Sequence, residues 1–383
     1  MAIGIPPTTT IRTTTVTPSA LSEHLYREKL LTDLFTAYYT ARSNKRNTHN
    51  QVRVERDLSN KLIELYHDIL ACRYKVGRSI CFIIERPVKR EVFAASFRDR
   101  IVHHYLYNYL MPIFDPMFIY DSYSCRVGKG TLFGINRLEH HIRSCSNNYT
   151  RECWVLKLDL TGYFMSMTRQ RLYDIVIGHL RRTGHDKDSE FRTVVYLLQK
   201  VIFNEPTKGC YMKGKRSDWE GLPPSKSLFH TPEGCGLPIG NLTSQLFSNI
   251  YLNEFDQYVK RVLKVKRYGR YVDDFYLVDN SKDRLLSLID PIRKFLDREL
   301  FLTLHPKKIY LQRQEKGVQF LGTVLKNGHR YMSARGHKMM METLSRRLTE
   351  EPNPYLVRSC VNSYKGYLSY MDNPDMRMLG RPW

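Results

Sequence analysis

The sequence lacks several features that would have suggested other classes of protein. Its eight cysteines are scattered and form no Cys-x-x-Cys pair, so a zinc knuckle is not indicated. Together with the absence of a recognisable signal peptide, this scatter predicts reduced thiols in the cytoplasm. No apolar run approaches the ~20 residues that a membrane-spanning helix needs, so insertion into a membrane is not expected.

Acidic residues are scarce relative to basic ones. The chain of 383 residues has 60 Lys and Arg against 38 Asp and Glu, a formal net charge of +22. Such an excess favours a polyanionic partner, although a merely soluble basic protein, or one attracted to anionic membranes, has the same composition. The length predicts about two or three domain-sized units.

Hydrophobic periodicity predicts mixed helices and strands after an irregular start. Residues 1–20 are rich in Thr and Pro and predict a disordered or extended tail. A helix is expected from about Leu21 to Arg42, followed by a polar loop over 41–47 and an amphipathic helix over 58–71. Further strands are expected over 80–95, 154–160 and 318–325, helices over 97–111, 132–142, 165–201, 241–262, 285–300, 338–348 and 357–370, and a long basic loop over 204–234.

The stretch from Lys266 to Asn280, KRYGRYVDDFYLVDN, predicts a β-hairpin with two adjacent carboxylates at its tip. These are Asp273 and Asp274. Like charges so close repel, and in a partly dry cleft the repulsion is costly unless a cation lies between them. The alternative is that Asp is simply a good turn residue.

A third carboxylate stands upstream in a matching context. Asp159 ends the alternating strand WVLKLDL and is followed at once by Thr161 and Gly162, where the strand breaks. The amides of such a turn can hold phosphate oxygens. Magnesium takes carboxylate oxygens together with phosphates and waters, and two such ions can activate a hydroxyl and stabilise a leaving pyrophosphate. The aspartates at 159, 273 and 274 suit that chemistry.

The YVDD hairpin with its upstream Asp resembles the palm of reverse transcriptases, and the resemblance extends from Arg86 to about Tyr370. Most members carry Gln-Gly and Ser-Pro in the block between these motifs. This sequence has Ile239-Gly240 and Ser244-Gln245 instead, which resembles the reverse transcriptases of diversity-generating retroelements. The segment LPPSKSLF over 222–229 also resembles that subgroup.

The resemblance implies a right-hand polymerase of the α+β class, with fingers, a palm built on an antiparallel ferredoxin-like sheet, and a small helical thumb. On this sequence the fingers would cover 21–150, the palm 151–332 with the basic loop 204–234 inserted, and the thumb 333–383. Nothing in the sequence resembles a nuclease, integrase or maturase domain, so nicking and priming are expected from elsewhere.

The resemblance also implies functional residues. Catalysis and the binding of two Mg²⁺ ions, or of Mn²⁺ as a substitute, would fall to Asp159, Asp273 and Asp274, with Leu160 beside them. Phe164 would act as a steric gate against a 2′-hydroxyl, although a core Phe is the plain alternative. The other nucleotide-binding residues would be Lys89, Arg90, Thr161, Gly162, Tyr163 and Gln245, and those facing the template or setting fidelity would be Arg126, Ile239, Gly240 and Asn241.

Three functions remain open at this point. The first is an RNA-directed DNA polymerase that uses dNTPs to copy template-repeat RNA into cDNA with errors at adenines, for a diversity-generating retroelement encoded by a bacterium or phage. Its partners would be the RNA, the RNA/cDNA duplex and a basic, oligomeric accessory variability protein. The second is a defence, retron-like or group II intron-like reverse transcriptase. The third is a non-catalytic RNA-binding protein on a polymerase fold, against which the complete acidic triad argues.

Overall fold

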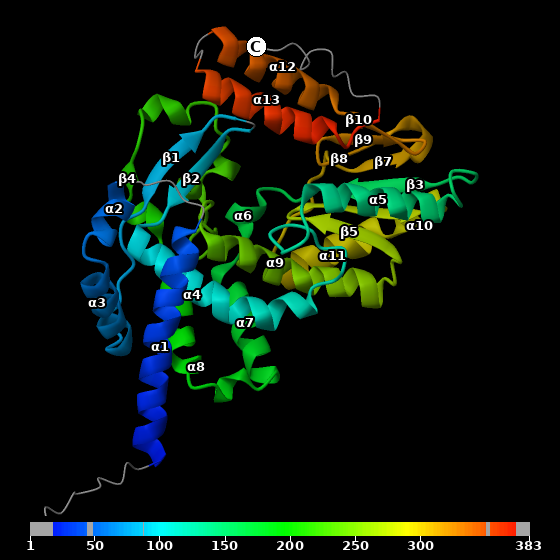
Figure 1. Ribbon diagram of the computed structural model, residues 1–383. Helices are drawn as coiled ribbons and strands as arrows, with labels where there is room; N and C mark the ends of the chain where they lie inside the picture. Colours follow the sequence, from blue (N-terminus) through cyan, green and yellow to red (C-terminus); the bar gives the residue numbers. More distant parts are fainter. Residues whose placement is uncertain (1–17, 44–48, 87, 350–352, 373–383) are drawn as a thin grey trace, which may run out of the picture.

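The computed structural model describes residues 18–43, 49–86, 88–349 and 353–372. Helices pack around sheets that are antiparallel in all but one strand pairing, so the predicted α+β class is confirmed (Figure 1). The predicted tail falls mostly outside these ranges, but the helix expected from Leu21 already begins at Pro18. The expected polar loop over 41–47 is largely outside them as well.

Most predicted elements are present with shifted ends. In the described ranges the α-helices are α1 (Pro18–Arg42), α2 (His49–Glu55), α3 (Leu58–Leu70), α4 (Phe97–Phe114), α5 (Thr131–Cys145), α6 (Tyr163–Ser166), α7 (Arg169–Arg182), α8 (Phe191–Ile202), α9 (Leu242–Gln257), α10 (Lys282–Ser287), α11 (Ile289–Leu300), α12 (Ala334–Thr349) and α13 (Pro354–Leu368). The strands are β1 (Ile80–Ile84), β2 (Arg90–Ala94), β3 (Trp154–Leu158), β4 (Tyr211–Met212), β5 (Arg267–Tyr271), β6 (Asp274–Asp279), β7 (Tyr310–Arg313), β8 (Val318–Phe320), β9 (Thr323–Lys326) and β10 (His329–Met332).

The central sheet has the order β5-β6-β3-β7 and is antiparallel throughout. Alternation along β3 sends Leu156 and Leu158 into a large core with α4, α7, α9 and α11. Val155 points to the other face, into a smaller core with α5, β8 and β9. Because Asp159 follows in the same alternation, its side chain lies on the same face of the sheet as Val155, at the end of that smaller core.

Helix α9 is buried along nearly its whole length, as a helix between two layers must be. It packs on α4 and α7 and on the hairpin β5–β6, and its exposed Gln245 interrupts an otherwise buried run. After Gln257 the helix continues as a π-helical turn over Tyr258–Val262. The expected helix over 241–262 is therefore one continuous element with a widened last turn.

The loop over 204–234 is folded against the hairpin β1–β2. Its two-residue strand β4 pairs in parallel with β1, beside the hairpin β1–β2. The buried carboxylate of Glu91 on β2 accepts hydrogen bonds from the Leu228 amide at 2.7 Å, the Trp219 indole at 2.8 Å and the Ser227 hydroxyl at 2.9 Å. These contacts attach the loop to the hairpin.

Four predicted elements are divided in the structure, and the first is the strand region expected over 80–95, which is the hairpin β1–β2. The strand expected over 318–325 is the hairpin β8–β9, because Leu321 and Gly322 take positive φ and reverse the chain. The helix expected over 165–201 is divided into α6, α7 and α8, with breaks at residues 167–168 and again where Gly184 adopts φ +81°. The helix expected over 285–300 is divided into α10 and α11 at Leu288.

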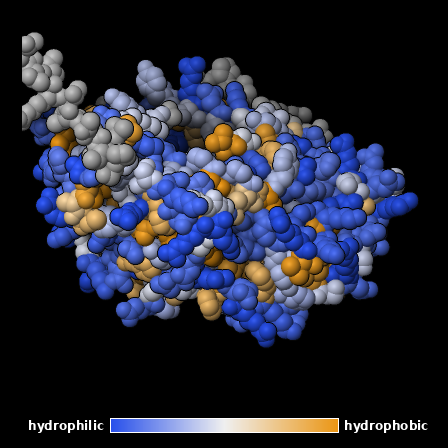
Figure 2. Space-filling view, turned by 90° about the horizontal axis from the view of Figure 1, so that it is seen from below, coloured by the Kyte–Doolittle hydropathy of each residue, from blue (hydrophilic) through white to orange (hydrophobic). Residues whose placement is uncertain are grey.

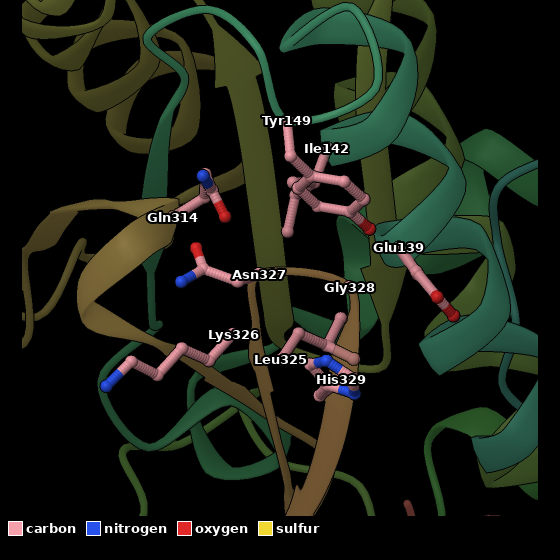
Figure 3. Close-up of a pocket in the computed structure, with 9 residues that line it drawn as sticks. All are labelled: Glu139, Ile142, Tyr149, Gln314, Leu325, Lys326, Asn327, Gly328 and His329. Carbon is pink, nitrogen blue, oxygen red and sulfur yellow. The ribbon is translucent and has the colours of Figure 1, made fainter.

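The second small sheet, β10-β9-β8, rests on α5. The turn before β10 lies over Tyr149, and a Cβ on Gly328 would lie 3.1 Å from that ring (Figure 3). Arg330 donates to Glu139 of α5 at 2.9 Å, and the same residue's amide bonds Asp372 beyond α13. The sheet therefore joins α5 to the C-terminal helices.

Helices α12 and α13 pack together around their own small core and lie across the hairpin β1–β2 and the sheet of β8–β10 (Figure 1). Arg86, in the loop between β1 and β2, lies 3.8 Å from Glu342 of α12, and both side chains are about half exposed. At the other end the Tyr367 hydroxyl lies 3.4 Å from that of Thr323. The C-terminal helices thus contact both small sheets.

The exposed surface is mixed. From below the view of Figure 1, hydrophobic residues form small separate patches among hydrophilic ones (Figure 2). Among the helices of the described residues, none is both long enough and apolar enough to cross a membrane.

Candidate active site

The predicted catalytic hairpin is present. Strands β5 and β6 pair in register up to Tyr271 and Asp274, which leaves Val272 and Asp273 as the turn. Val272 has a φ of +56°, a left-handed conformation that costs a β-branched residue roughly 1–2 kcal/mol. Such strain persists only where neighbouring groups enforce it. Here the buried guanidinium of Arg270 donates from Nη1 to the Val272 carbonyl at 3.0 Å.

Asp159 lies against this turn because β3 is the next strand of the sheet. The last pair of the β3–β6 register is Leu158 with Phe275, so one further step sets Asp159 opposite Asp274. Asp159 is fixed by its own carbonyl, which accepts the His305 amide at 2.8 Å. Leu160 forms an isolated bridge with Leu304 and is buried. The three aspartates predicted as a group thus lie at one edge of the sheet.

Two of the three aspartates are also in contact with a lysine. Lys308 forms an ion pair with Asp159, and Lys157 on β3 lies 3.5 Å from Asp274. Burial, followed by the negative charge of Asp159, raises the pKa of Asp273 to about 6. Burial also raises the pKa of Asp274, while Lys157 opposes that rise. The lysines therefore compensate the charge of the triad only in part.

The donor chemistry of this edge fits a divalent cation, since carboxylate oxygens that repel one another are what magnesium takes. Within the described ranges, however, no three His, Cys, Asp or Glu side chains are grouped so that they hold a metal ion as they stand. Asp159 and Asp274 are instead each in contact with an ammonium group, of Lys308 and Lys157 respectively.

The turn after Asp159 is closely packed. Gly162 has a φ of +53°, and a Cβ there would lie 2.8 Å from the Ser225 carbonyl, so only glycine fits. The Thr161 hydroxyl is buried and has no hydrogen-bond partner among the described residues, as expected of a group that awaits a ligand or a water. Tyr163 is buried with its hydroxyl on the Ser248 carbonyl at 2.8 Å, so its side chain is structural.

Phe164 and Ile239 lie at the same small apolar cluster. Both are half-buried and pack against a core of Cys81, Phe93, Met165 and Leu228. The Phe164 carbonyl accepts the Leu237 amide at 2.8 Å, and the Ile239 carbonyl accepts the Phe93 amide at 2.9 Å. The predicted gate and the predicted fidelity residue therefore pack against one cluster, and the gate role of Phe164 stays a prediction beside its packing role.

The residues after Ile239 connect α9 to β2. Gly240 has a φ of +121°, and a Cβ there would lie 2.8 Å from a methyl group of Val92. Asn241 is buried, and its side-chain oxygen accepts the Ala95 amide at 3.3 Å. Both residues thus hold strand and helix together, while the exposed Gln245 is the member of this block whose side chain is accessible.

The basic residues predicted at the site differ in whether their side chains already have partners. Arg90 is exposed and has no side-chain partner among the described residues, whereas Lys89 donates to the Glu220 carbonyl at 2.8 Å and pairs with Glu85. Arg126 is engaged within the protein: its side chain is only 7% exposed, and it bonds Asp115 and the carbonyls of Ile119 and Ser122. These contacts brace the segment before α5, and the role of Arg126 toward the template stays a prediction.

Sequence reasoning missed three residues that shape this site. Lys157 could have been found, because it stands two residues before Asp159 in an alternating strand and so shares its face. Glu91 and Arg270 gave no such signal. Each is a charged residue within a strand, and only the fold shows that its partners come from distant segments.

The site is that of a nucleotidyl-transferring polymerase palm, with carboxylates from two adjacent strands and a glycine turn beside them. A family model described as reverse transcriptase (RNA-dependent DNA polymerase) matches residues 89–325, more than half of the chain. The chain belongs to the reverse transcriptase family, whose right-hand architecture agrees with the antiparallel sheet and the flanking helices.

Individual relatives are more distant. Protein YkfC of Escherichia coli (strain K12) is 27% identical over 259 residues, which are 59% of this chain and 60% of YkfC. The apo telomerase of Candida tropicalis superposes with a TM-score of 0.49 at 10% identity, over 75% of this chain and 51% of that one. The telomerase of Candida albicans in complex with a TWJ fragment of telomeric RNA gives 0.45 at 11% identity, over 78% and 55%. The matches thus span between half and three fifths of these relatives.

Proposed function

We propose that the protein is an RNA-directed DNA polymerase that extends a primer on an RNA template with dNTPs. The observation that carries the proposal is the meeting of Asp159, Asp273 and Asp274 at one edge of the palm sheet, within a chain of the reverse transcriptase family. A non-catalytic RNA-binding protein would have no need to keep three repelling carboxylates in a half-buried site.

In this proposal the three aspartates hold two Mg²⁺ ions, with the carbonyl of Leu160 beside them, and Mn²⁺ is a substitute. Bound there, such ions lower the pKa of the primer hydroxyl and neutralise charge on the leaving pyrophosphate. The chain's own part is to present the carboxylates ionised and to release them from Lys157 and Lys308.

The nucleotide would lie over the turn that follows Asp159. The Thr161 amide donates to the Thr303 carbonyl at 2.9 Å, so this residue would face the phosphates with its unpartnered hydroxyl. The Gly162 amide and the exposed guanidinium of Arg90 would face them as well, with Lys89 contributing after release from Glu220. Phe164 would lie beneath the sugar and exclude a 2′-hydroxyl, and the exposed Gln245 would approach from α9. Tyr163 would contribute only through its backbone.

The division into domains follows the same proposal. The hairpin β1–β2 with the helices up to residue 150 forms the fingers, residues 151–332 the palm, and 333–383 the thumb. The basic loop 204–234 lies between fingers and palm and would contact RNA. We place the enzyme in the cytoplasm of a bacterium, encoded by the host or by a phage.

The more specific part of the proposal is a diversity-generating retroelement, in which template-repeat RNA is copied into cDNA with errors at adenines. It rests on Ile239 and Ser244-Gln245, which replace the Gln and the Ser-Pro of most reverse transcriptases. Ile239 lies in an apolar cluster and offers the template shape but no hydrogen bond. A basic, oligomeric accessory variability protein is the partner that this biology requires.

Primer extension on an RNA template tests the activity. Asp273→Ala should abolish cDNA synthesis while leaving RNA affinity intact, because binding depends on the basic surface rather than on the triad. Asp290→Ala removes an equally charged but exposed side chain on α11 and serves as the matched control. Extension by Asp273→Ala near the wild-type rate would refute the assignment.

Sequencing the cDNA tests the retroelement proposal. Ile239→Gln should lower misincorporation opposite adenine more than opposite other bases, whereas Ile239→Met, which stays apolar, should not. Equal adenine error rates in wild type and Ile239→Gln would remove Ile239 from the mechanism. Faithful, processive synthesis by wild type without any accessory protein would instead favour a defence, retron-like or intron-like enzyme.

A further inference from the structure

We propose that Arg270 is a positioning residue, one that holds the catalytic turn in its left-handed conformation and sets its place against α9. The inference rests on the proposed polymerase function. Arg270 touches neither substrate nor reacting atoms. It acts through the carbonyl of Val272, the residue immediately before Asp273.

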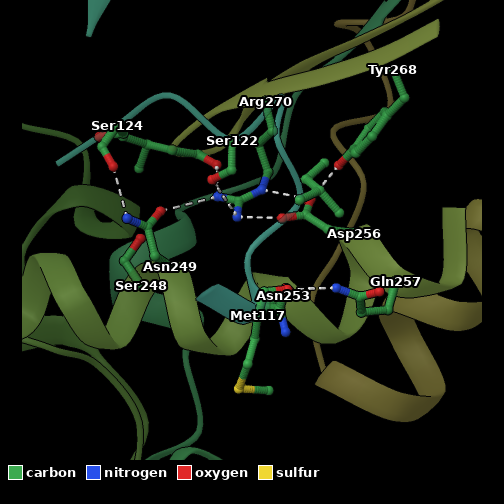
Figure 4. Close-up of polar contacts among 12 residues, drawn as sticks. Met117, Ser122, Ser124, Ser248, Asn249, Asn253, Asp256, Gln257, Tyr268 and Arg270 are labelled. Atoms are coloured by element: carbon green, nitrogen blue, oxygen red, sulfur yellow. Dashed lines mark hydrogen bonds and ion pairs between the residues drawn. The ribbon is translucent and has the colours of Figure 1, made fainter. Parts of the chain in front are cut away.

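The guanidinium is anchored first by a fully buried ion pair. Arg270 and Asp256 of α9 are both 0% exposed, and the contacts are bidentate, with Nε at 2.8 Å and Nη2 at 2.6 Å from the two carboxylate oxygens (Figure 4). Burial alone would lower the pKa of Arg270, but Asp256 raises it above its ordinary value. The Tyr268 hydroxyl donates to the same carboxylate at 2.7 Å, which fixes Asp256 in turn.

The remaining nitrogen, Nη1, is directed at the turn. It donates to the Val272 carbonyl at 3.0 Å, and Val272 is the β-branched residue with φ +56°. Without an anchor such a residue prefers the right-handed or extended regions, and either would rotate the following carboxylate. The planar fork of arginine makes both sets of contacts at once, which the single ammonium of lysine does not.

The same residue connects the hairpin to a third segment. The Arg270 amide donates to the Asp121 carbonyl at 2.9 Å, and its carbonyl accepts the Tyr123 amide at 3.0 Å. Asn249 of α9 reaches the Ser124 carbonyl at 2.8 Å. The guanidinium itself donates to the Ser122 hydroxyl at 3.4 Å and to the Asn249 side-chain oxygen at 3.5 Å (Figure 4). The turn, the buried helix and the segment before α5 thus meet at Arg270, which fixes the position of the triad relative to the helix that carries Gln245.

A purely structural ion pair predicts a different behaviour from a positioning one. Stability needs only the pair with Asp256, and its loss would lower the unfolding temperature without a specific catalytic defect. Positioning needs the hydrogen bond between Arg270 and Val272, so its loss must slow the chemical step. The rate must then recover when residue 272 is replaced by one that adopts positive φ without cost. Glycine is the residue that does so.

Single-turnover primer extension with Arg270→Lys, Val272→Gly and the double variant distinguishes the two. In Arg270→Lys we expect the maximal incorporation rate to fall about 10- to 100-fold, as for other residues that orient metal-binding groups, with the nucleotide dissociation constant unchanged. In the double variant the rate should be on the order of tenfold higher than in Arg270→Lys. This factor is equivalent to the free energy that a left-handed conformation costs Val272. Mn²⁺ binding to the RNA-bound enzyme, followed by electron paramagnetic resonance, should weaken and recover in the same order.

Leu197→Ala, in the core of α8, supplies a control of lowered stability without contact to the hairpin. It should lower the unfolding temperature and leave the incorporation rate per folded molecule unchanged. An Arg270→Lys rate like that of Leu197→Ala, or no recovery of rate and Mn²⁺ affinity in the double variant, would overturn the positioning role. Failure of wild type itself to extend any primer would instead refute the proposed function.

Discussion

Glu91 provides a direct test of how the loop 204–234 is held. Its buried carboxylate accepts three hydrogen bonds, and all three donors lie in that loop. We expect Glu91→Ala to leave the Leu228 amide, the Ser227 hydroxyl and the Trp219 indole without an acceptor. The loop should then separate from β2 while the rest of the fold remains.

The magnitude follows from the contacts. A hydrogen bond to a charged group contributes about 1.5–3 kcal/mol net, but the substitution also removes the cost of burying a carboxylate, so the three do not add. We expect a loss of about 2–4 kcal/mol for Glu91→Ala, which corresponds to about 3–5 °C in unfolding temperature for a chain of this size. Glu91→Gln keeps an acceptor for Leu228 but turns an amide donor toward Trp219, so about half of that loss should appear.

Hydrogen exchange and thermal unfolding check this prediction. Amide exchange over 216–230 should accelerate in Glu91→Ala, and nucleotide affinity should weaken because the Ser225 carbonyl packs against Gly162. Glu64→Ala, on the exposed side of α3, is the control and should change neither quantity. Unchanged exchange over 216–230 in Glu91→Ala would show that the three hydrogen bonds do not hold the loop.

Three further measurements follow from the structure. Phe164→Ala should admit ribonucleotides into the product, and unchanged discrimination between dNTPs and rNTPs would leave Phe164 as a packing residue. RNA affinity should fall with salt, with a log–log slope of about −0.7 for each phosphate contacted, and a flat response would exclude the +22 charge as the binding surface. Burial lowers the pKa of His103 from 6.5 to about 4, so its neutral form stabilises the fold above pH 6.5, and that stability, about 3 kcal/mol, is lost as the pH falls toward 4. Chemical denaturation at several pH values should show this loss in wild type but not in His103→Gln.

The sequence predicted those features that depend on local patterns. The hairpin around Asp273, the strand that ends at Asp159, and helices such as α3 and α11 follow from alternation, turn residues and helical spacing, which are properties of short segments. Gly162 was predicted beside the site from the strand break alone, and its contact with Ser225 gives the reason that glycine is required.

What the sequence could not provide are the partners of charged side chains. The sequence around Arg126 carries no sign of its partner, and only the position of Asp115 in the fold shows that the side chain is engaged internally. The ordered loop was equally hidden, because the carboxylate that anchors it lies more than a hundred residues away in the chain. Pairing across such distances depends on the whole fold, for which no window of sequence carries a signal.

The contact between Arg86 and Glu342 has a consequence for how a long RNA enters. An exposed ion pair of this kind contributes about 0–1 kcal/mol, so this contact adds little to the free energy needed to separate the β1–β2 loop from α12. If the polymerase function holds, we expect an RNA without a free end to enter laterally, between these two elements, rather than by threading from a terminus. The association rate for circular and linear templates of equal length should then be similar. Diffusional encounter with the RNA, rather than opening of the protein, would limit that rate.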